Sequence, residues 1–253
     1  MYVRIVQTRI KPGSLAAVQD LYNRKSIPKL QKVPGCLCAT LIHGEQEDTV
    51  ISLTLWASQE HLKSYEKSRL HQEFLREARV YLADSVEWKV QLSEDYTLDY
   101  EAVHEEPVVK SLPVVLQTSK DLCDTAPSRE TCTRIVSVKI LPDKMHEFRE
   151  LYAQEILPAI QAVKGCRQAF LAEGDAAEKE IYSITIWDSR EDVERYEQSG
   201  LFERLTEKVR HTFSELHEWQ VLLARDFDQA AVTKEVLKVN CYRVVTGMKF
   251  RQE

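Results

Sequence analysis

Several residue types and motifs are scarce in this chain, and each scarcity argues against a class of protein. The 253 residues include only 7 glycines, which are scattered and form no loop of the kind that binds phosphates or dinucleotides. No His-Glu-x-x-His pair and no nucleophile-elbow serine occurs. None of the 6 cysteines belongs to a Cys-x-x-Cys pair. Any chemistry must therefore come from side chains that are dispersed along the sequence.

Long apolar runs and clusters of basic residues are also missing. No apolar stretch approaches the roughly 20 residues that a membrane-spanning helix requires. The N-terminal MYVRIVQTRI enters a strand pattern directly, without the basic and apolar regions of a signal peptide. A net charge of −6 with no basic cluster argues against nucleic acid as a partner. We therefore expect a cytoplasmic protein with neither a membrane nor a nucleic-acid partner.

The cysteines are expected to be reduced in that compartment and mostly buried. Cys36 and Cys38 alternate along a predicted strand, so both thiols should share one face of the sheet. A metal role for this pair is the less favoured interpretation. Cys123 and Cys132 flank a loop that is rich in proline and serine, and they could pair if oxidised. The sequence leaves that pairing open.

What the sequence does contain is an internal duplication. The stretch TLWASQEHLKSYEKS at 54–68 matches TIWDSREDVERYEQS at 185–199 in its Thr-x-Trp-x-Ser step and its Tyr-Glu-x-Ser ending. A similar offset relates RIVQTRIKPG at 4–13 to RIVSVKILPD at 134–143. Single residues recur in the same way, for example Trp56 as Trp187 and Tyr22 as Tyr152. The chain is therefore a tandem duplication of one unit.

Each copy shows the same series of predicted elements. In the first copy, residues 2–10 alternate like a strand and 14–32 have the period of an amphipathic helix. Residues 36–44 and 49–56 are predicted to form a hairpin. Ser58 then caps a short helix, a second helix covers 69–83, and 85–96 is the closing strand. The order β-α-β-β-α-α-β predicts a ferredoxin-like α+β unit.

The third strand indicates how the units assemble, because neither of its faces is charged. Ile51, Leu53 and Leu55 alternate with Ser52, Thr54 and Trp56, and the second copy agrees. Two buried faces require a second covering layer, which the other copy can supply. We therefore expect the two sheets to face each other in an intrachain, dimeric α/β-barrel-like assembly with the helices outside.

The repeat also sets the expected domain limits. They are a first unit at 1–98, a crossover linker at 99–131 that could add an edge strand at 108–116, a second unit at 132–229, and a C-terminal strand and tail at 230–253.

This element order, together with the tryptophan and serine that lead into the short helix, resembles the antibiotic biosynthesis monooxygenase family of the dimeric α+β barrel superfamily. The resemblance implies a pocket in each unit between the sheet and its helices. It further implies oxidation of an aromatic or polyketide-like small molecule by molecular oxygen, with no cofactor and no metal. Trp56 and Trp187 match the tryptophan of the family.

Haem degradation is the less favoured activity of that family. The haem-degrading branch uses an asparagine on the first strand and a histidine in the long helix. This chain has Thr8 and Val138 at the first position, and Leu75 and Thr206 at the second. Both copies therefore lack both residues.

The candidate ligand-binding residues lie around the tryptophan. A tryptophan at a strand end is either a core anchor or a pocket wall, and both interpretations stay open. Small hydroxyl residues on the same face leave room that leucine or isoleucine would fill. The candidates are Trp56, Thr54, Ser52, Thr8, Tyr65 and His71 in the first copy and Trp187, Thr185, Ser183 and Tyr196 in the second. No catalytic residue is assigned.

Two classes of function follow. The chain is either a cofactor-independent monooxygenase or a small-molecule-binding or assembly protein that has kept the fold without the chemistry. In both cases the expected partner is a small hydrophobic or aromatic molecule, and further copies of the chain could pair through sheet edges. The first copy should have the more polar pocket, because it has Thr8, His61 and His71 where the second has Val138, Asp192 and Phe202.

Overall fold

The computed structural model describes residues 1–44, 49–92, 98–104, 108–117, 131–174, 180–214 and 237–249. The chain divides into two compact units. Unit 1 comprises Met1–Lys110 and Val244–Glu253, and unit 2 comprises Ser111–Arg243. The first copy of the repeat lies within unit 1 and the second within unit 2.

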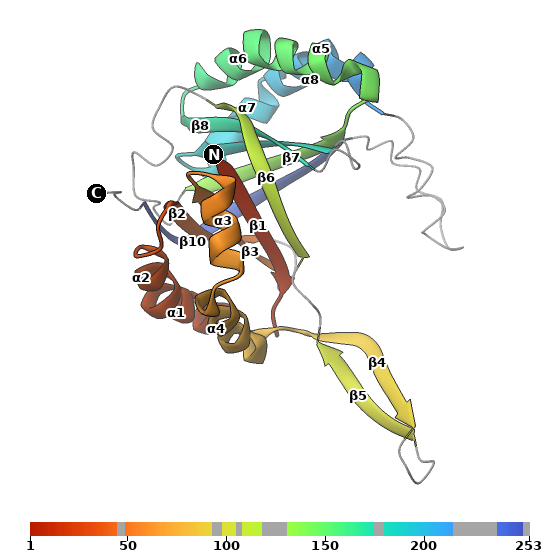
Figure 1. Cartoon of the computed structure of the whole chain (residues 1–253). Helices are drawn as coiled ribbons and strands as arrows, with labels where there is room; N and C mark the ends of the chain where they lie inside the picture. The colour runs from red at the N-terminus through yellow and green to blue at the C-terminus, as the bar shows by residue number, and fades with distance from the viewer. Residues whose placement is uncertain are drawn as a thin grey trace. The chain divides into compact units, whose positions relative to one another are not determined.

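Unit 1 is built on an antiparallel sheet in which β3 lies between two neighbours. The strands are β1 (Tyr2–Arg9), β2 (Cys36–Gly44) and β3 (Thr49–Trp56). Helical segments cover one face of this sheet (Figure 1). They are α1 (Leu15–Leu21), η1 (Tyr22–Ser26), α2 (Ile27–Leu30), α3 (Gln59–Glu66), α4 (Arg69–Ala78) and η2 (Arg79–Tyr81). Apolar side chains from strands and helices form one core between the two layers.

Unit 2 repeats this arrangement with β7 (Cys132–Lys139), β8 (Cys166–Glu173) and β9 (Glu180–Trp187), where β9 is central. Its sheet is extended on both sides, because residues 237–243 of β10 (Leu237–Lys249) pair with β7 and residues 114–117 of β6 (Val108–Gln117) pair with β8. The helical layer consists of η3 (Pro142–Lys144), α5 (Met145–Leu151), η4 (Tyr152–Ile156), α6 (Leu157–Gln161), α7 (Arg190–Gln198), α8 (Leu201–Val209) and η5 (Arg210–Thr212). The α+β class and the two tandem ferredoxin-like units are thus confirmed.

The first long helix of each copy contains a π-helical turn that the sequence pattern does not predict. In a regular α-helix the ring of Pro28 would clash with the carbonyl of the residue four positions earlier. A π turn relieves this clash, and its closing bond runs from the Ile27 N–H to the Tyr22 carbonyl. Pro158 has the same effect in unit 2, where the Leu157 N–H donates to the Tyr152 carbonyl. Each π turn begins at a buried tyrosine that belongs to the cavity wall described below.

Both faces of β3 are buried, as its uncharged pattern predicts. Ile51, Leu53 and Leu55 are buried on one face, and Thr54 and Trp56 are buried on the other. The same is true of β9. The face-to-face packing of the two sheets stays a prediction.

The closing strand predicted for the first copy lies outside the sheet that contains β1, β2 and β3. A strand does form there, β4 (Asp84–Leu92), but it pairs with β5 (Leu98–His104) in an antiparallel two-stranded sheet. Only residues 93–97 separate the two strands. A connection this short closes at little entropic cost, which favours the local hairpin. The corresponding segment of the second copy, including Trp219, lies outside the described residues.

The four cysteines whose burial the structure describes, Cys36, Cys38, Cys132 and Cys166, are buried, but the first two are not arranged as predicted. A β-bulge between Cys36 and Cys38 aligns Cys36 with Trp56 and Cys38 with Leu55, so the two thiols lie on opposite faces of the sheet. Cys123 lies outside the described residues. Within the described ranges, no group of three or more His, Cys, Asp or Glu side chains could hold a metal ion. No helix in those ranges is long and apolar enough to cross a membrane.

Candidate functional site

Unit 1 contains a cavity of about 140 Å³ between the sheet and its helices. Much of the wall is apolar, with contributions from strands β1, β2 and β3 and from helical segments on both sides. Five of the six residues predicted for this copy line the cavity: Thr8, Ser52, Thr54, Tyr65 and His71. Exposed Leu75 of α4 also lines it, which places an opening of the cavity beside this helix.

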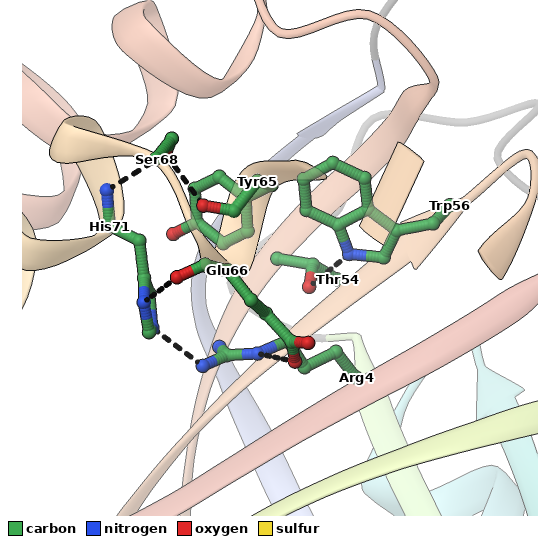
Figure 2. Close-up of polar contacts among 7 residues, drawn as sticks. All are labelled: Arg4, Thr54, Trp56, Tyr65, Glu66, Ser68 and His71. Carbon is green, nitrogen blue, oxygen red and sulfur yellow. Dashed lines mark hydrogen bonds and ion pairs between the residues drawn. The ribbon is translucent and has the colours of Figure 1, made fainter. Parts of the chain in front are cut away.

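Arg4 is the most important residue of the cavity that the sequence interpretation missed. Its side chain is buried on β1, and the residue is only 5% exposed. The Nε atom donates a hydrogen bond to Glu66 Oε1 at 3.3 Å, and Nη2 lies 2.8 Å from His71 Nε2 (Figure 2). The guanidinium also lies 5.9 Å from the ring centre of Tyr65. A cation is thus held at one end of an otherwise largely apolar space.

The contacts of His71 define its protonation state. His71 Nδ1 lies 3.1 Å from the backbone carbonyl oxygen of Glu66. Because a carbonyl oxygen can only accept a hydrogen bond, Nδ1 must carry the hydrogen. A guanidinium can only donate, so His71 Nε2 must accept from Arg4. The ring is therefore neutral. Burial, and then the positive charge of Arg4, hold the pKa of His71 below its ordinary value.

The helix ends place His71 at this position. Ser68 is the N-cap of α4, and its hydroxyl accepts a hydrogen bond from the His71 N–H while donating to the Tyr65 carbonyl (Figure 2). The Tyr-Glu-x-Ser ending of the repeat therefore contains three cooperating residues. Tyr65 supplies an aromatic wall, Glu66 binds both Arg4 and His71, and Ser68 caps the next helix.

Tyr22 and Ser52 form a second polar contact inside the cavity wall, with their hydroxyl oxygens 3.1 Å apart. Burial raises the pKa of Tyr22 far above its ordinary value, so this phenol stays protonated. The same pair recurs in unit 2, where the Tyr152 and Ser183 oxygens are 2.7 Å apart and burial raises the pKa of Tyr152. Since both copies keep it, this pair fastens the π turn to the sheet.

Trp56 lies behind the cavity wall. It is fully buried, and among the described residues the cavity lining does not include it. Its ring stacks on Tyr65 with the centres 4.8 Å apart, and its Nε1–H donates to Thr54 Oγ1 at 2.9 Å (Figure 2). Burial raises the pKa of Tyr65 to about 12. The geometry supports the anchor interpretation of the tryptophan, and Tyr65 is the ring that faces the cavity.

His61 lies away from the cavity, at the start of α3. Its N–H donates to the N-cap Ser58, and a Cβ on Gly35 would lie 2.2 Å from the His61 ring. Gly35 also has a φ of 75°, so only glycine fits this turn. Asp192 packs against Gly165 in the same way. The difference between His61 and Asp192 is therefore a difference between helix caps and not between cavities.

Unit 2 has a smaller cavity, of about 50 Å³. Arg134 takes the place of Arg4 and is 3% exposed, with its Nε 2.9 Å from Glu197 Oε1. Phe202 stands where unit 1 has His71, and its ring centre lies 4.2 Å from the Arg134 guanidinium carbon. No hydrogen-bond partner for Arg134 Nη2 occurs in the part of the chain that the structure describes.

The four residues predicted for this copy divide into two pairs. Ser183 and Tyr196 line the cavity, whereas the described lining includes neither Thr185 nor Trp187. Trp187 donates its Nε1–H to Thr185 Oγ1 at 2.8 Å and packs on Tyr196 with the ring centres 5.1 Å apart. This is the same arrangement as that of Trp56, Thr54 and Tyr65.

Comparison with known proteins identifies the family. The family model described as "Antibiotic biosynthesis monooxygenase" matches residues 1–77 and 131–208, which is more than half of the chain and includes most residues that line the two cavities. The chain belongs to the antibiotic biosynthesis monooxygenase family. No curated protein matches this sequence.

Solved structures share the fold of this family member over nearly its whole length. The alignment with a "Putative monooxygenase" from Fusobacterium nucleatum covers 100% of this chain and 98% of the other chain, at 8% identity and a TM-score of 0.67. A second one, from Lactobacillus acidophilus, covers 98% and 95% at 10% identity and a TM-score of 0.64. An "anthrone oxidase-like protein" covers 99% and 93% at 14% identity and a TM-score of 0.59. At such identities the likeness concerns the fold.

Unit 1 of this family member combines three features that suit chemistry on a small aromatic molecule. The walls are largely apolar, a buried cation stands at one end, and a neutral imidazole accepts a hydrogen bond beside that cation. A ligand hydroxyl that entered between Arg4 and His71 could donate to the imidazole and place its oxygen beside the guanidinium. Unit 2 offers the cation without the base.

Proposed function

We propose that this chain binds a small hydroxylated aromatic molecule in the cavity of unit 1 and oxidises it with molecular oxygen, without a metal or an organic cofactor. The observation that carries the proposal is the 2.8 Å contact between Arg4 and neutral His71 at the polar end of this cavity. Membership of the monooxygenase family supports the reaction class. The ligand class rests on the cavity itself.

The volume of the cavity limits the size of the ligand. An engineered cavity of about 150 Å³ in another protein binds benzene. The 140 Å³ of unit 1 therefore suits about one aromatic ring, and a longer molecule would have to extend through the opening beside Leu75. A single-ring phenol or hydroquinone is accordingly a better fit than a large polycyclic compound.

The side chains suggest how the ring would be activated. The phenolic hydroxyl gives its proton to His71 Nε2, and the phenolate that results pairs with Arg4. The apolar walls exclude water from the electron-rich ring, and oxygen would reach the ring through the opening beside Leu75. One phenol and one O₂ then give one para-quinone and one water. The substrate supplies all four electrons, so no external reductant is needed.

A ligand-binding protein without turnover is the second candidate. The observation that favours it is the lowered pKa of His71, because a weaker base removes a phenolic proton less readily. The two candidates share the binding site. They differ in whether oxygen is consumed.

Oxygen uptake and ligand binding, measured on the same samples, separate the two candidates. We expect one of a panel of phenols and hydroquinones, with haem included, to cause uptake of one O₂ for each substrate molecule consumed. His71→Gln keeps a hydrogen-bonding group but no base, and should lower the rate by about 10²–10⁴-fold. The matched control is Phe202→Gln at the same position of unit 2, which should keep the parental rate. Binding without any uptake across the panel would leave the binding protein as the function.

A further inference from the structure

The second unit carries the same cavity in a closed form, and we infer that each chain binds a single ligand, in unit 1, because Phe148 and Phe202 block the site in unit 2. The inference rests on the proposed function for the ligand class only. It does not require that the ligand be oxidised.

At most of the matched positions where the walls of the two cavities differ in size, unit 2 has the larger side chain, whereas Phe74/Leu205 and Leu75/Thr206 on the covering helix are the reverse. At four matched lining positions unit 2 has the larger side chain, so that Val18, Ser26, Ala78 and Leu82 of unit 1 correspond to Phe148, Ile156, Val209 and Phe213 of unit 2. All four residues of unit 2 are buried. The ring of Phe148 packs against those of Tyr152 and Phe213, with ring centres 5.8 and 6.5 Å apart. The space that unit 1 leaves open is thus filled by aromatic and aliphatic side chains.

The polar end of the unit 2 cavity is closed by a different residue. In unit 1 the Arg4 Nη2 donates to His71, and a ligand hydroxyl could replace that bond with two of its own. In unit 2 the Phe202 ring lies over the guanidinium of Arg134 and offers only its π face. As a result, the buried Nη2 of Arg134 has no hydrogen-bond acceptor among the described residues. Phe202 therefore covers the cation that would otherwise receive the ligand oxygen.

The remaining volume agrees with a closed site. A water molecule needs roughly 10–15 Å³, whereas a benzene ring occupies a cavity of about 150 Å³. The 50 Å³ of unit 2 therefore admits water and excludes an aromatic ring. Removing the two phenylalanine rings should restore a site for the same class of ligand, with the ligand oxygen on Arg134.

4-Bromophenol tests this inference, because its bromine can be located in soaked crystals by anomalous scattering and its binding counted by titration calorimetry. In the wild-type chain we expect bromine in unit 1 only and a stoichiometry of one. The double variant Phe148→Val/Phe202→His gives unit 2 the residues of unit 1, and should show bromine in both units and a stoichiometry of two. Bromine in unit 2 of the wild-type chain would overturn the inference. So would an empty unit 2 in a folded double variant.

The reciprocal variant keeps the test decisive if the double variant does not fold. Val18→Phe places the blocking side chain of unit 2 in unit 1, and should lower the stoichiometry from one to zero while circular dichroism stays unchanged. Unaltered binding in this variant would contradict the blocking role of Phe148. Bromine in unit 1 without oxygen uptake would support the inference and remove only the proposed oxidation. Bromine in neither unit of the wild-type chain would overturn the inference and the proposed ligand together.

Discussion

Unit 1 and unit 2 share one set of buried polar contacts and differ in what surrounds it. Both keep the Arg–Glu pair, the Tyr–Ser pair and the Trp–Thr pair. They differ at His71 and Phe202 and along the wall that Phe148 fills. In this duplicated chain, the contacts that recur in both copies stabilise the shared fold, and Arg4 or Arg134 also gives each cavity its cation. Residues that differ between the copies report on the site.

The covering helices show the same contrast. Helix α8 of unit 2 buries Leu205 and Val209, whereas none of the residues of α4 in unit 1 is buried. Both helices have a distinct apolar face. The apolar face of α4 lies over the open cavity, and Leu75 on it is 42% exposed. An open site thus leaves its covering helix with less buried contact.

The largest effects on stability should come from substituting the two tryptophans, which occupy the same position in both units. Trp56→Ala and Trp187→Ala each remove a fully buried indole together with its hydrogen bond to a threonine. We expect each change to lower the free energy of unfolding by about 3–5 kcal/mol. Denaturant unfolding measures both, with exposed Leu75→Ala as a control of little effect. A much smaller loss of unfolding free energy for Trp56→Ala than for Trp187→Ala would mean that Trp56 does not anchor the core of unit 1. The two units would then differ in more than the cavity lining.

Filling the cavity of unit 1 should stabilise the chain and abolish binding. Ser26→Ile introduces the residue that unit 2 has at Ile156, at a buried lining position. Cavity-filling changes commonly add about 0.5–2 kcal/mol to the free energy of unfolding. Unfolding curves and 4-bromophenol titration should show a more stable variant that binds less.

Ile156→Ser is the matched control for that prediction. It should destabilise unit 2 by a few kcal/mol, in the range of about 2–5 typical of truncated core isoleucines. If Ser26→Ile destabilised the chain instead, the residues around position 26 would be packed too rigidly to accept the larger side chain.

Much of the fold could be predicted because each helix and strand pattern occurs twice in the sequence, so the two copies check each other. Ser58 and Ser189 cap their helices as expected, and the hairpins that end at Trp56 and Trp187 pair as expected. The π turns were missed because hydrophobic period alone cannot show how a helix adapts to a proline. The partner of β4 was missed because a strand pattern does not specify which strand it pairs with.

The site was predictable in its location and less so in its residues. The hydroxyl residues on β3 do line the cavity, as does His71. Arg4 could have been found, since a charged residue in the middle of an apolar strand recurs as Arg134 and each has a matching glutamate. The volume difference between the cavities could not have been found, because it arises where residues such as Val18 and Leu82, distant in sequence, meet in space.

His71 should give unit 1 a pH-dependent contribution to stability that unit 2 lacks, because Phe202 at the same position cannot titrate. Burial, and then Arg4, hold the pKa of His71 below its ordinary 6.5, so the ring stays neutral as the pH falls through 6.5. The unfolded chain binds the proton first. The contribution of His71 to stability is therefore complete above pH 6.5 and is lost as the pH falls toward its lowered pKa.

Proton NMR of the His71 ring should give a midpoint below 6.5. His71→Phe, which copies unit 2, should remove this part of the pH dependence of the melting temperature. A midpoint at or above 6.5 would mean that the Arg4 contact does not persist in solution.

The smallest expected effect concerns ion pairs that hold α4 over the open cavity. Lys25 of η1 lies 3.3 Å from Glu77, and Lys29 of α2 lies 3.4 Å from Glu73 and over the ring of Phe74. Glu77 and Phe74 also line the cavity, so these pairs connect the two sides of the opening beside Leu75. Because the lysines are exposed, each pair should contribute only about 0.2–1 kcal/mol to stability. Their effect on the rate of ligand passage should be easier to measure than their effect on stability.

Lys25→Met/Lys29→Met should therefore leave the unfolding free energy nearly unchanged and raise the association and dissociation rates of 4-bromophenol together, as measured by NMR exchange. The affinity should change little, since the contacts inside the cavity are the same. Added salt should raise the rates of the wild-type chain and not those of the variant. Lys208→Met is the matched control, because Lys208 pairs with Glu155 between the corresponding helices of unit 2, where we expect no ligand. Equal rates in all three proteins would show that α4 moves independently of these pairs, or that the ligand enters by another route.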